Sequence, residues 1–176
     1  MDWIILLPIL AFVALASGLL VVFRGTGRIV ARTREVESFR TAIHDLTTRV
    51  DASLTGAAGR IDLVRHHALE PAALGETLTA ASDAVEQYLE EAKALHTPKA
   101  ATPIREDLVH GLERAGRALS TVEHGTNILA SVRGGARELE AQTSIKRGYL
   151  NLIHAREAIA RQAILADELK QADHTM

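Results

Sequence analysis

The first feature of the chain is an unbroken apolar run from Trp3 to Phe23 that contains no charged residue. At about 1.5 Å per residue, a helix over this run is roughly 31 Å long. The hydrocarbon core of a bilayer is about 30 Å thick. The pattern therefore predicts a membrane-spanning helix over residues 1–23.

The charges around the apolar run indicate its orientation. Only Asp2 precedes it, and arginines follow it within a basic segment, residues 24–35. Positively charged flanks stay in the cytoplasm, and Trp3 suits the interfacial position, so we expect an outside N-terminus and a cytoplasmic remainder. The residues that carry this topology prediction are Trp3, Arg24, Arg28, Arg32 and Arg34.

A cleavable signal peptide is the alternative interpretation of this segment. Ala14-Leu15-Ala16 resembles a cleavage site, but a signal peptide starts with positive charge and this chain starts with Met1-Asp2. An uncleaved anchor is favoured. Small residues on one side of it, at Ala11, Ala14 and Gly18, are spaced so that two membrane helices could pair closely.

From Val36 onward, apolar residues recur at intervals of three and four, which is the pattern of amphipathic helices. One helix is expected from Val36 to about Leu69, because Glu70 precedes Pro71. A second is expected from Leu74 to Leu95, followed by a loop over 96–103. A third begins near Pro103 and carries apolar residues as far as Val132. A last helix runs to about Ala172.

Gly134-Gly135 decides the number of helices. A reversal at this pair gives four helices, and a continuous rod gives three. We favour the reversal, because the rod would leave a long apolar stripe without a neighbour. The expected fold is all-α: a membrane stalk followed by an antiparallel helical bundle or coiled-coil domain over residues 36–172, with a short tail, 173–176.

Composition narrows the function. The chain has 176 residues and no cysteine, which excludes disulfides, thiol nucleophiles and cysteine-ligated zinc. The net charge of -2 argues against nucleic acid as a partner. Neither a nucleophile elbow nor a phosphate-binding loop occurs, so we expect no enzyme activity, small-molecule substrate or cofactor.

Eight histidines in a helical protein raise the possibility of a metal-carboxylate site. The candidate pairs do not point inward, however. At about 100° per residue, the side chains of His110-x-x-Glu113 and His154-x-x-Glu157 lie far from the apolar stripes of their helices, and His124 beside Glu123 also points away. We therefore predict no metal site, and a metal-binding bundle enzyme is the least favoured alternative.

The region from Gly111 to Gly148 favours protein interaction. Gly111, Ala118 and Gly125 recur every seven residues and would allow a close helix neighbour. Polar residues crowd the stretch that follows, either as a docking surface or as arginine stems extending to the bundle edge. The predicted partner interface comprises His124, Asn127, Arg133, Arg137, Asn151 and Arg156.

These patterns together predict a single-pass, self-associating interaction module, a scaffold or adaptor in the cytoplasmic membrane of a bacterium. Its partners would be the lipid bilayer, a second copy, or another membrane or cytoplasmic protein. A regulatory transducer is the alternative, with a helix-register change near Leu54, Gly56 and Gly59. The layout is similar to that of LemA-type bacterial membrane proteins, and this similarity concerns architecture alone.

Overall fold

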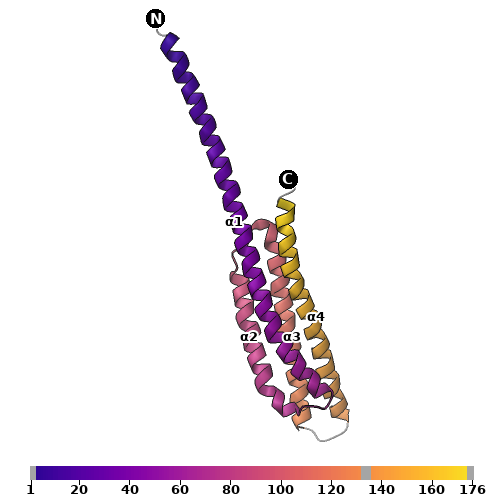
Figure 1. The fold of residues 1–176 in the computed structure, drawn as a ribbon. Coiled ribbons are helices and arrows are strands. Elements are labelled where there is room, and N and C mark those ends of the chain that lie inside the picture. Colours follow the sequence, from indigo (N-terminus) through magenta and orange to yellow (C-terminus); the bar gives the residue numbers. More distant parts are fainter. Residues whose placement is uncertain (1–2, 132–135, 174–176) are drawn as a thin grey trace.

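The computed structural model describes the backbone of residues 3–131 and 136–173, and the side chains of residues 33–131 and 137–169. All regular structure in the described part of the chain is helical (Figure 1). The α-helices are α1 (Trp3–Arg65), α2 (Gly75–Ala94), α3 (Thr102–Ser131) and α4 (Ala136–Asp173), and the 3₁₀ turns are η1 (Pro71–Leu74) and η2 (Lys99–Ala101).

The four helices form an antiparallel bundle in which each helix runs opposite to the one before it (Figure 1). The prediction of four helices rather than three is confirmed. Gly134 and Gly135 themselves lie outside the described residues. The chain nevertheless reverses between Ser131 and Ala136, because α3 and α4 pack side by side in opposite directions.

Helix α1 continues well beyond the bundle at its N-terminal end (Figure 1). The C-terminal end of α4 lies at the end of the bundle from which α1 emerges. The opposite end holds the α1–α2 connection and the α3–α4 reversal. Any structure attached to the start of α1 therefore lies on the same side of the bundle as the end of the chain.

The apolar stripes expected from the sequence form the core. On α1, Phe39, Ile43, Leu46, Val50 and Leu54 are all buried, and each following helix contributes its own stripe. The core consists of aliphatic side chains around this line, with Phe39 the one aromatic residue among the buried core members that the structure describes. The buried residues with no remaining exposure include Leu74, Leu108, Leu112, Leu119 and Leu152.

The end of α1 differs from the sequence expectation by a few residues. The helix ends at Arg65 because His67 takes a left-handed conformation, with φ of 58°. The amide of Ala68 then donates to the carbonyl of Leu63 at 2.8 Å, and the amide of His67 donates to Val64 at 3.0 Å. These two bonds form a Schellman cap, which closes the helix before Pro71 can limit it.

Ion pairs along the bundle edge join α1 to two of its neighbours. The Arg156 guanidinium of α4 donates to Asp51 of α1 at 2.9 Å. Nearer the stalk, Asp167 of α4 accepts from Arg40 at 3.3 Å and lies 3.1 Å from the His44 ring. On the α2 side, Arg49 pairs with Glu91. Each pair is partly exposed, so it orients the helices more than it stabilises them.

A buried polar side chain on α4 has one atom without a hydrogen-bond partner. Gln162 is 5% exposed; its Nε2 donates to the carbonyl of Ala158, but its Oε1 has no partner in the described structure. We expect Gln162→Leu to raise the free energy of unfolding by about 1 kcal/mol, since an unsatisfied buried acceptor is removed. Urea denaturation of the full chain measures this. Thr47→Val is the matched control and should be near neutral, because the buried Thr47 hydroxyl already donates to Ile43.

Candidate interaction surfaces

The described residues of the predicted partner interface lie on α3 and α4. His124 and Asn127 are exposed on α3, and Arg137 and Asn151 are exposed on α4. Arg156 is turned toward α1, where it pairs with Asp51. Arg133 lies outside the described residues.

Asn151 lines a groove between α3 and α4 on the outer side of the bundle. This groove has a volume of about 430 Å³, and its other polar walls are Arg114, Arg117, Thr121 and His154. It contains no carboxylate, so its electrostatic character is basic. The structure thus brings one predicted interface residue into a cationic groove that was not recognised from the sequence.

Glycines let α3 and α4 approach each other closely, as the spacing of seven predicted. A Cβ atom added at Gly125 would lie 2.9 Å from the carbonyl oxygen of Ala141 on α4. Gly148 supplies the matching gap from α4: a Cβ there would lie 2.9 Å from the carbonyl oxygen of Ala118. These two helices make the most extensive contact in the bundle. The α3–α4 hairpin is therefore its most tightly packed part.

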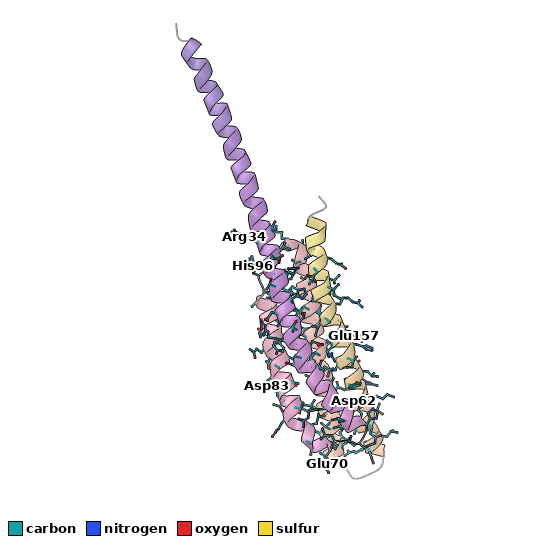
Figure 2. The ribbon with its side chains drawn as sticks, viewed as in Figure 1. Arg34, Asp62, Glu70, Asp83, His96 and Glu157 are labelled. Carbon is teal, nitrogen blue, oxygen red and sulfur yellow. The ribbon has the colours of Figure 1, made fainter. Side chains whose placement is uncertain are left out.

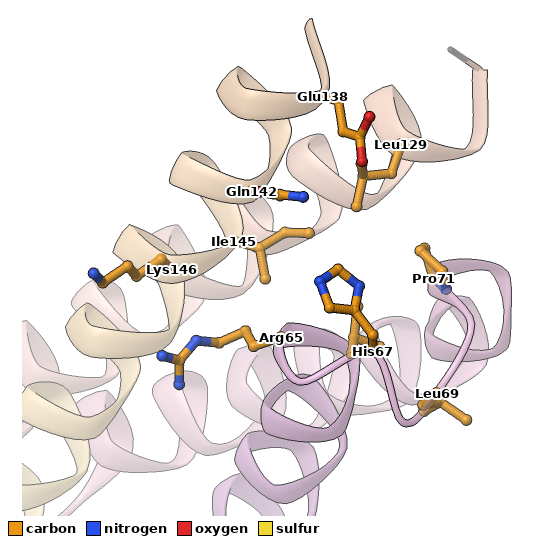
Figure 3. A pocket seen from close by; sticks show the side chains of 10 residues that line it. Arg65, His67, Leu69, Pro71, Leu129, Glu138, Gln142, Ile145 and Lys146 are labelled. Carbon is orange, nitrogen blue, oxygen red and sulfur yellow. The ribbon is translucent and has the colours of Figure 1, made fainter. Parts of the chain in front are cut away.

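A pocket of about 500 Å³ lies at the bundle end opposite the stalk (Figure 3). Its size falls within the range of small-molecule sites. Figure 3 shows the His67 ring opposite Ile145, with Glu138 and Leu129 at the rim. Arg65 is held at this end, with its guanidinium 4.4 Å from the Tyr149 ring centroid and 2.6 Å from Asp62. The pocket combines apolar walls with charged side chains of both signs, Arg65, Lys146 and Glu138.

The histidine–carboxylate pairs considered for metal binding are on the surface. His110 is exposed and lies 3.5 Å from Glu113, and His154 and Glu157 are exposed on α4. Over the part of the chain that the structure describes, no three metal-ligating side chains come together.

The outer face of α4 carries apolar side chains that the sequence interpretation missed. Leu139, Leu150 and Ile164 are 68%, 44% and 60% exposed. With Leu63 on α1, they are the exposed large aliphatic residues of the described chain. Their spacings of eleven and fourteen residues are close to whole numbers of helical turns. This periodicity in the sequence indicates that the three side chains share one face of the helix.

The structure lowers the pKa of the Asp167 carboxylate. A hydrogen bond from the His44 ring, with the nearby Arg40 guanidinium, holds the pKa of Asp167 below its ordinary value of 3.8. A depressed carboxylate pKa stabilises the fold above pH 3.8, and the contribution is lost as the pH falls through the lowered value.

We expect Asp167→Asn to be less stable than the parent chain at neutral pH, and the difference to narrow as the pH falls below 3.8 toward the lowered pKa of Asp167. Urea titrations of both full-length chains between pH 7 and pH 3 measure this. Asp83→Asn, on the exposed surface of α2, is the matched control for the loss of a surface carboxylate. A constant difference for Asp167→Asn over the whole range would contradict the assignment.

The topology residues Trp3, Arg24, Arg28 and Arg32 and the small residues Ala11, Ala14 and Gly18 have side chains outside the described part of the structure, whereas Arg34 is exposed beside the bundle (Figure 2). Within residues 33–131 and 137–169, no helix has the length and apolar character needed to cross a membrane. No protein-family model, curated protein or solved structure matches this chain.

Proposed function

We propose that this chain is a single-pass, membrane-anchored helical interaction module, a scaffold or adaptor whose bundle lies in the cytoplasm. The observation that carries the proposal is the continuity of α1 from Trp3 to Arg65. One helix includes both the apolar run and the first core stripe of the bundle. An anchor in that run would hold the bundle at a set distance and orientation from the bilayer.

The bundle surface supports interaction rather than chemistry. Its candidate features are the exposed aliphatic line on α4, the basic groove beside Asn151 and the pocket at the far end. Aliphatic side chains that share one face of a helix can insert between residues of a facing helix.

Single-cysteine labelling tests the anchor and its direction, because the native chain has no cysteine. In intact cells, a membrane-impermeant maleimide should label Asp2→Cys and should not label Asp83→Cys until the cells are permeabilised. Both chains should resist alkaline extraction from the membrane fraction. Labelling of Asp83→Cys in intact cells, or release of the chain by alkali, would overturn the proposal.

A regulatory transducer is the second candidate, and two exposed glycines favour it. Nothing lies within 4 Å of a Cβ added at Gly56 or Gly59, so neither glycine is needed for packing inside the described bundle. Each weakens α1 by about 1 kcal/mol relative to alanine. A locally weak helix connected to an anchor could change its register in response to a membrane partner.

A further inference from the structure

Helix α4 is apolar on two opposite faces. Its inner face packs on α3 through Ile145 and Ile159, which lie against Gly125 and Gly111. Leu139, Leu150 and Ile164 lie within about 40° of one another on the other side, roughly opposite to that inner face. Figure 2 shows Glu157, which shares this outer side, projecting away from the other helices.

The outer face has the spacing of a helix that pairs along its length. Between Leu139 and Ile164 its positions alternate at intervals of four and three. This alternation is the seam of a coiled coil, in which such positions insert between residues of a facing helix. All of these positions are exposed except Ile153, which is half-buried. They are Leu139, Thr143, Lys146, Leu150, Ile153, Glu157, Ala160 and Ile164.

The seam is complementary to itself when reversed. Each seam position has a counterpart at the same distance on the other side of the point between Asn151 and Leu152. In an antiparallel pair, each side chain faces the counterpart position of the second copy. Apolar side chains then face apolar side chains of similar size, and charged side chains face the opposite charge. Leu150 then faces Ile153, and the ammonium of Lys146 faces the carboxylate of Glu157. The remaining pairs are Leu139 with Ile164 and Thr143 with Ala160, and at the flank Glu140 comes near Arg161.

A parallel arrangement lacks this complementarity. In parallel register each Lys146 faces the other Lys146, and each Glu157 faces the other Glu157, so like charges oppose each other in the seam. We propose that the outer face of α4 binds the same face of a second copy in antiparallel orientation. Antiparallel pairing is isologous, so it closes as a dimer.

The geometry of α1 gives this dimer a consequence. Because α1 leaves the bundle at the end where α4 finishes, an antiparallel pair has its two stalks at opposite ends (Figure 1). This consequence rests on the proposed membrane anchor: with an anchor on each stalk, the dimer links two apposed membrane surfaces. The pairing itself does not depend on the anchor.

Two single-cysteine variants test the orientation. Full-length Lys146→Cys and Glu157→Cys chains, carrying tags of different size, are purified in detergent and oxidised separately and as a mixture. Antiparallel pairing predicts a disulfide-linked mixed dimer and little product from either variant alone. Two copies of residue 146 would be separated by about 16 Å along the seam, beyond the limit of about 7 Å between the Cα atoms of a disulfide.

Charge exchange supplies a second readout on the same face. Lys146→Glu and Glu157→Lys should each weaken the dimer by roughly tenfold in sedimentation equilibrium, and the double variant should restore it, because opposite charges again face each other. Glu86→Lys, on the exposed surface of α2, is the matched control and should leave the dimer unchanged. Same-residue disulfides, a monomer in detergent, or a double variant no better than the singles would overturn the proposal.

Reconstitution separates this inference from the proposed anchor. With both correct, the full chain inserts into phosphatidylglycerol-containing vesicles and clusters them, and the double charge exchange preserves clustering. If the anchor fails, the mixed disulfide still forms but the chain stays out of the vesicles. If the pairing fails, the chain inserts, and neither clustering nor the mixed disulfide appears.

Discussion

Replacing Gly148 with alanine is expected to lower the free energy of unfolding by about 2 kcal/mol, although alanine is the better helix former. The added Cβ would lie 2.6 Å from a Val122 methyl carbon, 2.9 Å from the carbonyl oxygen of Ala118 and 3.0 Å from the Val122 amide nitrogen. Two of these neighbours are backbone atoms of α3. The helices can accept the methyl only by moving apart, which loosens the most extensive helix contact of the bundle.

Urea denaturation of the full-length chains, followed by circular dichroism, measures this loss of stability. Two glycines on α3 provide graded controls. A Cβ at Gly111 would lie 2.7 Å from Cγ1 of Ile159 and 3.9 Å from the Ile159 amide nitrogen, so its close contact is with a side-chain atom and Gly111→Ala should be less costly. A Cβ at Gly116 would lie 3.8 Å from Val85, an ordinary contact, so Gly116→Ala should stabilise. Equal effects at Gly148 and Gly116 would refute the close approach of α3 and α4.

The glycine seam shows how far sequence alone could reach. The interval of seven from Gly111 through Ala118 to Gly125 predicted a close neighbour, and the structure confirms it. The role of Gly148 was not predicted, because it depends on which residues of α3 face it. That register is a property of the paired helices, and a periodicity within one helix does not specify it.

The outer face of α4 was missed for a related reason. The sequence interpretation allowed this helix only the single apolar stripe that a bundle helix needs, which in the structure includes Ile145 and Leu152. Leu150 and Ile153 belong to a second stripe interleaved with the first. Only burial separates the two, since the first is covered by α3 and α1 and the second is mostly exposed.

Helix ends and edge contacts were the least predictable features. Pro71 sets the latest residue at which α1 can end, and this limit is readable from the sequence. The cap at His67 ends the helix earlier. The sequence does not specify that cap, because several polar residues tolerate a positive φ. The ion pair of Arg156 with Asp51 was not predicted either. Whether an arginine at a stripe edge meets a carboxylate depends on the neighbouring helix, which lies about a hundred residues away in sequence.

Replacing both Gly56 and Gly59 with alanine is expected to raise the free energy of unfolding by about 2 kcal/mol. Both glycines lie within α1, and nothing within 4 Å would contact the new methyl groups. The gain comes from helix propensity alone, at about 1 kcal/mol for each glycine replaced. Ala52→Gly, at another exposed position of α1, is the reverse control and should lose about 1 kcal/mol. A loss of stability in the double variant would mean that something outside the described chain packs against these glycines.

The same double variant distinguishes an adaptor from a transducer. An adaptor requires a bundle of constant shape, so stiffening α1 should leave the yield of the mixed disulfide between cysteines at positions 146 and 157 unchanged. A transducer requires α1 to shift against α4, and the ion pairs of Asp51 and Asp167 would transmit that shift to the α4 helix. An altered disulfide yield in the Gly56→Ala, Gly59→Ala chain would therefore favour the transducer, because these substitutions lie in α1, outside the seam on α4, and change only the stiffness of α1.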